Sequence, residues 1–349
     1  MQKNESVKKT KILILKLGAI GDVVMALSLI TAIEQKYPGA EITWVCGKIV
    51  EPVLSALKKI NTLITVDEHK FYKNGLRGKI SAISDVWRAL KGKRFDIAIN
   101  CYRSKMYKLL LLPVRSNVYL DFSGRDRTNS FIPGRYHADE YARIILGTDD
   151  WQLKNMKFPK INLDGNSEIK QLIKDIPSPK IILAPGGTKN ILRSDDLRRW
   201  HVENYKELAR KLLEQNPSVI LVGAESDGWV TKEFIGINVV NLIGKTSLLD
   251  MIRLFTNADV LVTHDTGTLH LAKLSDINII ALFGPVNPKE RIGVNENAEI
   301  FWGGKKLPCS PCYDGRNFAD CNNNICMKNI SVEEVFERIV NKLKTEKRK

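Results

Sequence analysis

The turn Gly18-Ala19-Ile20-Gly21-Asp22 places two glycines and a carboxylate directly after an apolar segment. Glycines let the backbone approach a ligand closely, and the start of a helix offers unpaired N–H groups. A dinucleotide-binding turn has the pattern Gly-x-Gly-x-x-Gly, whereas this turn has only Gly-x-x-Gly, which argues against a dehydrogenase. Two interpretations of Asp22 remain open, a helix cap favoured by the helix dipole or a general base that points into a cleft.

A similar group of small and acidic residues lies in the second half of the chain. Asp265, Thr266 and Gly267 follow the apolar run 260–263, and His270 lies about one helical turn further on. Thr266 and Gly267 would present backbone N–H groups and a hydroxyl to a pyrophosphate. Asp265 would accept hydrogen bonds from sugar hydroxyls, whereas a lone histidine such as His270 is usually structural.

Two more expected strand ends carry polar residues that suit a nucleotide. The segment 184–189 contains Gly187 and Thr188 and would cradle a phosphate with help from Arg198 and Arg199, although the same residues also form ordinary turns. Glu225 follows the apolar run 219–222 and is placed to bind ribose hydroxyls.

Four of the six cysteines are clustered near the C-terminus, namely Cys309, Cys312, Cys321 and Cys326. The second pair is spaced more widely than in a usual zinc ribbon. The spacing leaves three interpretations open: a structural zinc site, reduced structural thiols, or disulfides.

Short β-branched runs alternate with amphipathic stretches along most of the chain, and Ser247 with Asp250 and Ser331 with Glu334 form capping-box patterns. Strands are predicted at 12–17, 42–46, 63–66, 97–101, 118–121, 180–184, 219–222, 239–242, 260–263 and 279–283. Helices are predicted at 23–35, 51–57, 80–90, 138–146, 202–214, 247–256 and 268–274. This alternation predicts right-handed βαβ units and mainly parallel sheets.

The alternation lapses between residues 147 and 179, where prolines and glycines interrupt a polar stretch. An α/β fold of two doubly wound domains is therefore predicted, at 1–165 and 166–330, with a C-terminal helix and basic tail at 331–349. Ligands bind beside the carboxyl ends of parallel strands, so the turns described above are expected to face a central cleft. The basic segment 70–79 is predicted to be an exposed loop.

The chain is strongly basic, with 54 Lys and Arg residues, 39 Asp and Glu residues and a formal net charge of +15. Such an excess is typical of proteins that bind polyanions, although a solubilising surface gives the same excess. No apolar run reaches the ~18–20 residues that span a bilayer, and no secretory signal precedes the first strand, so we expect a cytoplasmic protein. No nucleic-acid motif is present, which makes a non-catalytic nucleic-acid or membrane-binding protein the weaker interpretation.

Taken in order, these motifs resemble glycosyltransferase family nine, the ADP-heptose:lipopolysaccharide heptosyltransferases. The resemblance covers almost the whole chain, and the joint order and spacing of its motifs make it specific. The matching segments are 17–24, 184–187, Trp200 with Tyr205 and Leu208, 222–225, 243–248, 264–267 with His270, 281–285 and 308–312.

The resemblance implies a GT-B architecture of two Rossmann-like domains, with the acceptor bound by the N-terminal domain and the nucleotide sugar by the C-terminal domain. It also implies an inverting, metal-independent transfer of heptose from ADP-L-glycero-D-manno-heptose to the inner core of lipopolysaccharide, with Asp22 as the base and no cofactor. The residues expected to bind the donor are Gly187, Thr188, Arg198, Glu225, Asp265, Thr266, Gly267 and His270.

The chain departs from the family pattern beside the donor diphosphate. The family usually has a lysine there, followed by a Trp-Pro pair, whereas this chain has Arg198, and Trp200 is followed by His201. Arginine still neutralises phosphate, in a bidentate manner. The segment 188–196 is longer than usual, which weakens the assignment of Thr188.

The acceptor implied by the resemblance is an anionic lipopolysaccharide precursor at the inner membrane face, so a cytoplasmic protein peripheral to that membrane is expected. The residues expected to bind the acceptor are Gly18, Gly21, Arg103, Lys105, Arg125 and Arg127, although solvated surface charge is the alternative for the four basic ones. The alternative function is a glycosyltransferase of the same family with another nucleotide sugar or acceptor. The sequence predicts neither nucleic-acid binding nor an oligomeric state.

Overall fold

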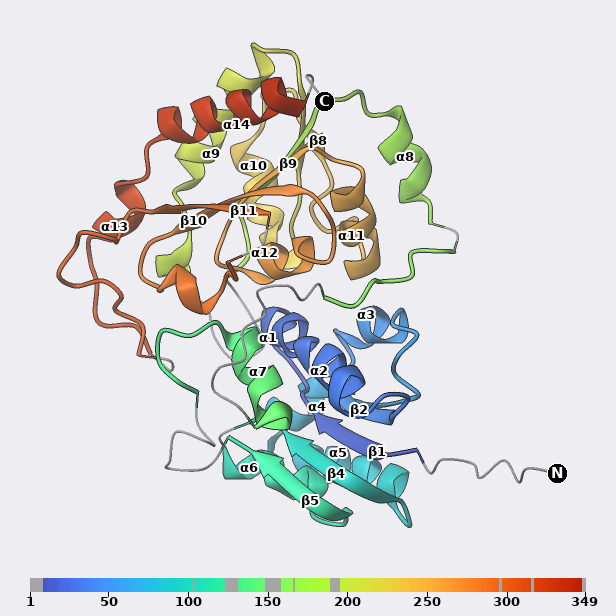
Figure 1. The fold of residues 1–349 in the computed structure, drawn as a ribbon. Coiled ribbons are helices and arrows are strands. Elements are labelled where there is room, and N and C mark those ends of the chain that lie inside the picture. Colours follow the sequence, from blue (N-terminus) through green and yellow to red (C-terminus); the bar gives the residue numbers. More distant parts are fainter. Residues whose placement is uncertain are drawn as a thin grey trace. The chain divides into compact units, whose positions relative to one another are not determined.

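The computed structural model describes residues 9–102, 104–122, 131–147, 158–165, 167–188, 195–294, 297–314 and 317–346 (Figure 1). The chain divides into two compact units, Met1–Asn162 and Leu163–Lys349. The sequence analysis placed this boundary after residue 165. Each unit contains one parallel sheet with helices, as the alternation of strands and helices predicted.

The sheet of the first unit has the strand order β3-β2-β1-β4-β5, and all of its strands are parallel. The central strand β1 is buried along Ile12–Leu15, as expected for a parallel strand covered on both faces. The strands are β1 (Lys11–Leu15), β2 (Glu41–Gly47), β3 (Thr62–Val66), β4 (Arg94–Asn100) and β5 (Arg115–Asp121).

The helices predicted for this unit are present with two differences, and the helical elements at 105–108 and 109–111 were not predicted. The stretch predicted as one helix at 23–35 forms two, which meet at Leu27. The helical elements are α1 (Ile20–Ala26), α2 (Ser28–Lys36), α3 (Glu51–Ser55), α4 (Glu68–Tyr72), α5 (Gly75–Leu90), α6 (Lys105–Lys108), η1 (Leu109–Leu111) and α7 (His137–Leu146). None of the helices within the described ranges is both long enough and apolar enough to cross a membrane.

The second difference is the basic segment 70–79, which is helical, so the predicted loop was wrong. The Asp67 side chain accepts a hydrogen bond from the backbone N–H of Lys70 and caps α4. The buried face of α5, formed by Ala82, Val86 and Leu90, packs into the core. This packing outweighs the low helix propensity of the glycines near the start of α5.

The sheet of the second unit has the strand order β11-β10-β9-β6-β7-β8, again all parallel. Five of its strands match predicted runs, whereas β11 was not predicted. Its residues Ala298–Trp302 are only partly buried at the sheet edge, so they lack the continuous apolar run of an inner strand. The strands are β6 (Lys180–Ala184), β7 (Ser218–Leu221), β8 (Val240–Asn241), β9 (Val260–His264), β10 (Asn278–Phe283) and β11.

The helices predicted at 202–214, 247–256 and 268–274 begin within one residue of the predicted starts, whereas the helices at 169–175, 228–233 and 325–328 were not predicted. The capping box at Ser247 is confirmed, because Ser247 Oγ accepts from Asp250 N and Asp250 Oδ2 accepts from Ser247 N. At Ser331 the Oγ accepts from Glu334 N and donates to Glu334 Oε2. The helical elements are α8 (Ile169–Asp175), η2 (Asp196–Arg198), α9 (Val202–Leu213), η3 (Glu225–Asp227), α10 (Gly228–Glu233), α11 (Leu248–Thr256), α12 (Gly267–Ala272), η4 (Pro288–Glu290), α13 (Ile325–Lys328) and α14 (Val332–Glu346).

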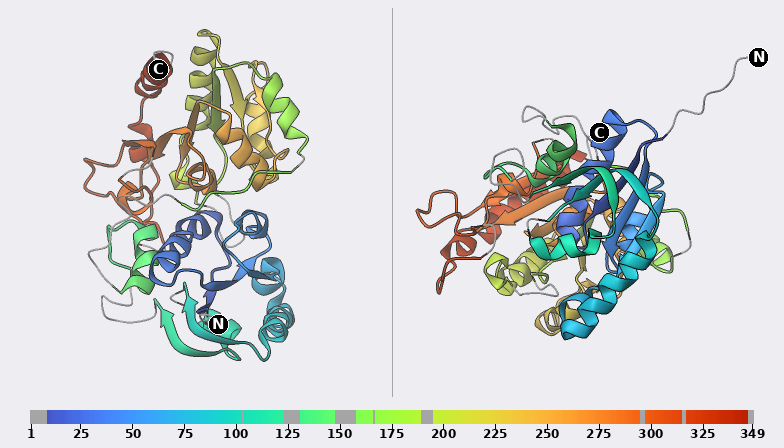
Figure 2. Two further views of the ribbon diagram at one scale, coloured as in Figure 1. Left: turned by 45° about the vertical axis from the view of Figure 1, so that its right-hand side comes forward. Right: turned by 90° about the horizontal axis from the view of Figure 1, so that it is seen from below.

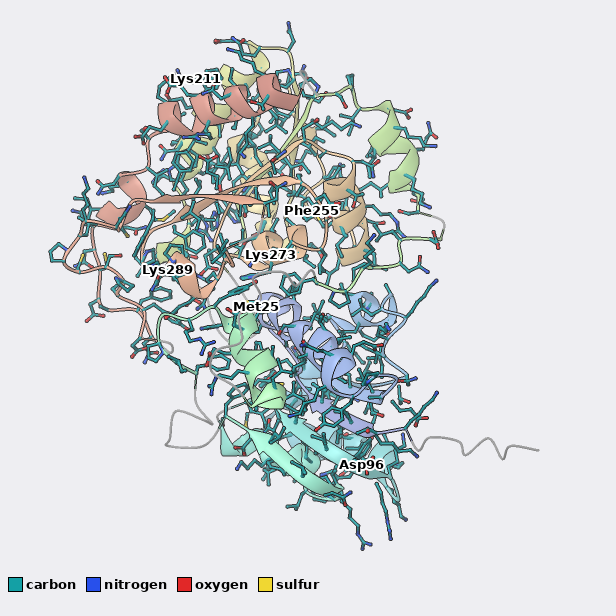
Figure 3. All side chains as sticks on the ribbon, in the orientation of Figure 1. Met25, Asp96, Lys211, Phe255, Lys273 and Lys289 are labelled. Atoms are coloured by element: carbon teal, nitrogen blue, oxygen red, sulfur yellow. The ribbon has the colours of Figure 1, made fainter. Side chains whose placement is uncertain are left out.

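One face of the second sheet is covered by α9 and α14, which lie side by side (Figure 1). Trp200 and Tyr205 are fully buried there with Val335 and Ile339. The Trp200 Nε1–H donates to the backbone oxygen of Ile330, and Lys211, labelled in Figure 3, pairs with Glu333. This packing fixes the start of α9, and with it the position of the preceding η2, which ends in Arg198.

Candidate functional site

Asp22 lies in the first turn of α1, immediately beyond the carboxyl end of the central strand β1. The N-cap residue of α1 is Ala19, so Asp22 is the third helical residue and does not cap the helix. Its side chain is 44% exposed. Of the two interpretations left open by the sequence, the structure therefore removes the simple cap and leaves a carboxylate accessible to solvent.

Lys16 lies beneath Asp22 and is the first residue after β1. Its Nζ is 3.2 Å from Asp22 Oδ2, and its own side chain is only 4% exposed. The ring centroids of Tyr102 and Tyr141 lie 4.4 Å and 5.7 Å from this Nζ. Burial works to lower the pKa of Lys16, but the Asp22 charge and Tyr141 raise it above its ordinary value, so Lys16 is a permanent cation.

Tyr102 also fixes the loop that leads from β1 into α1. Its hydroxyl accepts hydrogen bonds from the backbone N–H groups of Leu17 at 2.8 Å and Gly18 at 3.2 Å. The same hydroxyl donates to the backbone oxygen of Gly18. Burial raises the pKa of Tyr102 well above its ordinary value, so this hydroxyl keeps its proton. The loop before Asp22 is therefore held by a neutral donor and acceptor from the end of β4.

Gly18 is required because another side chain occupies the space beside it. A Cβ at this position would lie 2.7 Å from Oε1 of Glu68. A Cβ at Gly47 would lie 2.2 Å from the same carboxyl group. Glu68 is buried, and burial raises its pKa above the ordinary value. The glycine predicted to approach a ligand thus also makes room for a buried carboxyl group.

The other residues predicted to bind the acceptor are only partly described. Gly21 is the second residue of α1, next to Asp22. Lys105 is the first residue of α6, but its side chain is outside the described part of the structure. Arg103, Arg125 and Arg127 lie outside the described residues, so their assignment stays a prediction.

The predicted donor residues converge at the carboxyl edge of the second sheet. The strands β9, β6 and β7 are neighbours, and the turns that follow them contain the residues in question. Asp265, Thr266 and Gly267 follow β9, while Gly187 follows β6 and Glu225 follows β7. This is also where the order of the sheet reverses around β6, the position at which parallel α/β sheets bind ligands.

Asp265 is the centre of a charged network at this edge. Its Oδ2 lies 3.3 Å from Nη1 of Arg198 and 3.7 Å from Nε of Arg291, and its Oδ1 lies 3.7 Å from Nε2 of His270. Burial works to raise the pKa of Asp265, but His270, Arg198 and Arg291 together hold it far below its ordinary value. Asp265 is therefore an anion that orders two guanidinium groups.

Two histidines next to this network are neutral. Burial and the charges of Arg199 and Arg198 lower the pKa of His264 to about 3, and burial and Lys273 lower the pKa of His270. His264 Nδ1 lies 3.1 Å from the hydroxyl of Tyr205. His270 Nδ1 and Arg198 Nε are buried without a hydrogen-bond partner among the described residues. Unsatisfied buried groups of this kind are uncommon. An anionic ligand would accept from the Arg198 Nε–H, whereas the neutral His270 ring, with Nε2 facing Asp265, presents Nδ1 as an acceptor for a donor such as a hydroxyl.

The loop after β6 fits tightly against its neighbours. A Cβ at Gly187, where φ is +86°, would lie 2.8 Å from Cγ2 of Thr266. Asp227 Oδ1 accepts from Gly187 N at 2.9 Å, and its Oδ2 accepts from Ala224 N at 2.9 Å. Asp227 thus ties the loops after β6 and β7 to each other.

Thr188 and Glu225 flank this loop and differ in exposure. Thr188 is buried, and its hydroxyl lies 2.9 Å from Nη2 of Arg199 and 3.0 Å from Asp196 Oδ1. Glu225 is exposed, and Gly244 packs against its backbone. Glu225 is therefore free to receive hydroxyl groups of a ligand, whereas Thr188 already serves to hold Arg199.

The structure describes all four clustered cysteines and gives no support to the zinc interpretation. Among the described residues, no group of three or more Cys, His, Asp or Glu side chains is arranged to hold a metal ion. The described cysteines are also free of disulfides. The cluster packs on the turn after β10, where Ser310 Oγ donates to Gly284 O and Cys312 N donates to Pro285 O.

Three residues of the site were missed by the sequence analysis, namely Lys16, Asp227 and Arg291. Lys16 lies within the strand predicted at 12–17 and was given no role. Arg291 follows η4, and its backbone oxygen accepts from Lys273 Nζ, which ties it to the end of α12. Its approach to Asp265 depends on this tertiary contact, so no local pattern could have revealed it.

Comparison with known proteins assigns the chain to a family. The family model for glycosyltransferase family 9 (heptosyltransferase) matches residues 83–322, well over half of the chain. The lipopolysaccharide core heptosyltransferase OpsX of Haemophilus influenzae is 26% identical, with 93% of this chain and 94% of that protein covered.

Solved structures of the same kind show the fold. The E. coli ADP-heptose LPS heptosyltransferase II has a TM-score of 0.71 at 20% identity and covers 97% of this chain and 100% of its own. The E. coli heptosyltransferase WaaC with ADP-2-deoxy-2-fluoro heptose has a TM-score of 0.68 at 19% identity, covering 95% of this chain and 99% of its own. The fold is GT-B, with two Rossmann-like domains, and the chain belongs to glycosyltransferase family 9, the heptosyltransferases.

Proposed function

We propose that this glycosyltransferase moves heptose from ADP-L-glycero-D-manno-heptose to the inner core of lipopolysaccharide, with inversion at the anomeric carbon. The observation that carries the proposal is the ion pair of Lys16 and Asp22 at the end of β1. It places one exposed carboxylate next to a buried lysine at the carboxyl edge of the first sheet. The names of the related proteins, which specify ADP-heptose and lipopolysaccharide, support the choice of donor and acceptor.

In the proposed reaction Asp22 accepts the proton of an acceptor hydroxyl while that oxygen attacks the anomeric carbon of the heptose. The new C–O bond forms as the bond to the β-phosphate oxygen breaks, and ADP leaves with the bonding electrons. Attack from the face opposite the leaving group inverts the anomeric configuration.

The second unit would stabilise the negative charge that develops on ADP. Arg198 and Arg291 lie beside Asp265, and both guanidinium groups are partly buried, so their interaction with a diphosphate is screened less than at an open surface. Asp265 would accept hydrogen bonds from the heptose, and Thr266 and Gly267 would donate backbone N–H groups to the diphosphate. Glu225 would contact the nucleotide. The cations come from the chain itself, which agrees with metal-independent transfer.

The test offers the purified protein a lipopolysaccharide precursor that lacks core heptose, together with ADP-heptose, UDP-glucose or GDP-mannose in separate reactions. Mass spectrometry is expected to show that the lipid gains one heptose in the reaction with ADP-heptose and no sugar in the other two reactions. Transfer from ADP-heptose is expected to continue in the presence of EDTA. NMR of the product is expected to show the anomeric configuration opposite to that of the donor.

Two results would contradict the proposal in different ways. Transfer from another nucleotide sugar, with none from ADP-heptose, would point to a family member with a different donor. Retention of the donor's anomeric configuration would exclude Asp22 as a base in a single displacement. A parallel reaction with the Asp22→Asn variant controls for contaminating transferases, because only transfer by this chain depends on that carboxylate.

A further inference from the structure

We propose that α5 and η1 dock the first unit on the surface of an anionic phospholipid bilayer. The inference rests on the proposed function only in that a lipid-linked acceptor would place the enzyme at such a surface. Neither family membership nor the donor site assigns a role to these two elements. Figure 2 shows α5 along the outside of the first unit.

The first observation is an apolar stripe on α5 that faces away from the core. Leu76, Ile80 and Trp87 are spaced by four and seven residues, which puts them on one side of the helix. Ile83, which lies between them, is only partly exposed and packs against the core. Leu76 is 74% exposed, Ile80 54% and Trp87 36%. The core-facing side of the helix is formed by other residues, namely Ala82, Val86 and Leu90.

The second observation is that η1 extends the stripe. Trp87 Nε1 donates to the backbone oxygen of Leu109 at 2.8 Å, which joins the stripe to η1. Leu109 is 44% exposed, and Leu112, which directly follows η1, is 66% exposed. Scattered apolar side chains on a surface are ordinary, whereas a group on two elements joined in this way indicates an interaction surface. We call Leu76, Ile80, Trp87, Leu109 and Leu112 the α5 patch.

The charge around the α5 patch identifies the partner. Residues 69–94 contain eight Lys or Arg residues and one acidic residue, Asp85. Lys73, Arg77 and Lys93 are all exposed. An apolar helix face beside a basic one is typical of helices that lie in the interface of an anionic membrane. A second copy of this chain would bring the same positive charge against itself, so self-association is disfavoured by this arrangement.

The experiment measures flotation of the full-length protein with vesicles of phosphatidylcholine alone or phosphatidylcholine mixed with phosphatidylglycerol. The wild type is expected to float with the anionic vesicles, and high salt is expected to weaken its binding. The Leu76→Ser/Ile80→Ser/Leu112→Ser variant is expected to bind at least about tenfold more weakly. The Lys73→Gln/Arg77→Gln/Lys93→Gln variant is expected to bind anionic vesicles at least about tenfold more weakly than the wild type. Its vesicle binding should also depend much less on salt concentration.

Matched controls come from the second unit. Ile235→Ser/Val294→Ser removes two exposed apolar side chains, and Lys232→Gln/Lys305→Gln/Lys306→Gln removes three exposed charges. Both controls are expected to bind vesicles like the wild type. Circular dichroism and thermal melting establish that every variant is folded, since all substituted side chains are exposed.

Three outcomes would overturn the inference. The wild type could fail to bind anionic vesicles, or the α5-patch variants could bind as well as the wild type. A dimer that becomes a monomer when the α5 patch is changed, without vesicle binding, would identify a second copy as the partner. Vesicle binding is read without any sugar transfer, so this test stands even if the proposed function fails. If both hold, the variants are expected to slow transfer to acceptor in vesicles while leaving transfer to a deacylated, water-soluble acceptor unchanged.

Discussion

Lys16 Nζ lies 3.2 Å from Asp22 Oδ2, and the lysine of this pair is buried while the carboxylate is half exposed. The two residues come from a strand end and the first turn of the next helix, so the pair is built into the β1–α1 connection. A cation next to a carboxylate favours the ionised form of that carboxylate, and the ion pair orients it. A base that must accept a proton from an approaching hydroxyl needs both properties.

Replacing Asp22 by Asn is expected to remove nearly all transfer without changing the fold or ADP binding. General bases contribute about 10²–10⁴-fold to rate, so kcat is expected to fall within that range. The measurements are initial rates with saturating donor and the Kd of ADP by calorimetry. Asp85→Asn, at an exposed aspartate of α5 that pairs with Arg88, is the matched control and should keep wild-type activity. Normal turnover by Asp22→Asn would eliminate Asp22 as the base.

Replacing Lys16 by Met tests whether this lysine positions and ionises Asp22. Removal of the positive charge favours the protonated carboxyl group, so the acidic limb of the kcat/KM profile should move to higher pH. The Lys16→Arg variant keeps the charge and should restore the acidic limb at least in part. ADP binding, which we propose for the second unit, should not change. A uniform loss of activity at every pH, with an unmoved acidic limb, would mean that Lys16 serves the fold alone.

The local motifs of the site could be predicted from the sequence because each is a strand followed by a small-residue turn and a helix. Asp22, Gly187 and the turn at 265–267 all lie at carboxyl ends of parallel strands, as this pattern indicates. Lys16 and Arg291 were not predicted as site residues, because their roles depend on partners far along the chain. Lys16 is enclosed by Tyr102 and Tyr141, and Arg291 reaches Asp265 from the loop after η4.

The same distinction explains the errors in the elements. The segment 70–79 has glycines and charges that locally favour a loop, but packing of the apolar face of α5 on the sheet makes it helical. The strand β11 lies at the edge and pairs only with β10, so it needs no continuous apolar run. Both outcomes follow from tertiary contacts that local patterns do not contain.

Replacing Arg198 by Met is expected to weaken ADP binding by about tenfold or more, because a partly buried charge-assisted contact to the diphosphate is lost. Arg198→Lys keeps the positive charge but not the two-pronged geometry of the guanidinium group. Its affinity for ADP should therefore lie between those of the wild type and Arg198→Met. Arg210→Met, at an exposed arginine on α9 of the same unit, is the control. Calorimetry with ADP and with AMP separates the diphosphate from the nucleoside. Equal losses for both ligands would argue against contact with the second phosphate.

His264 predicts a pH dependence of stability. Its pKa falls from 6.5 to about 3 on folding, so between these values the unfolded chain binds the extra proton and the folded chain does not. Stability therefore falls as pH drops below about 6.5, by about 2 kcal/mol between pH 7 and pH 5. In urea unfolding, the His264→Gln variant should lose about 2 kcal/mol less stability than the wild type between pH 7 and pH 5. His201→Gln, at an exposed histidine of the same unit, should retain the wild-type dependence.

Replacing Gly187 by Ala tests the close fit between the loop after β6 and Thr266. Gly187 and Gly236 have similar φ values, +86° and +80°, so an alanine at either position carries a similar backbone cost of about 1 kcal/mol. Only at Gly187 would the new Cβ meet Thr266, at 2.8 Å, whereas nothing lies within 4 Å of a Cβ at Gly236. Gly187→Ala should therefore lose more stability than Gly236→Ala in thermal melts, and it alone should weaken ADP binding. Equal effects of the two variants on ADP affinity would show that the contact with Thr266 does not shape the donor site.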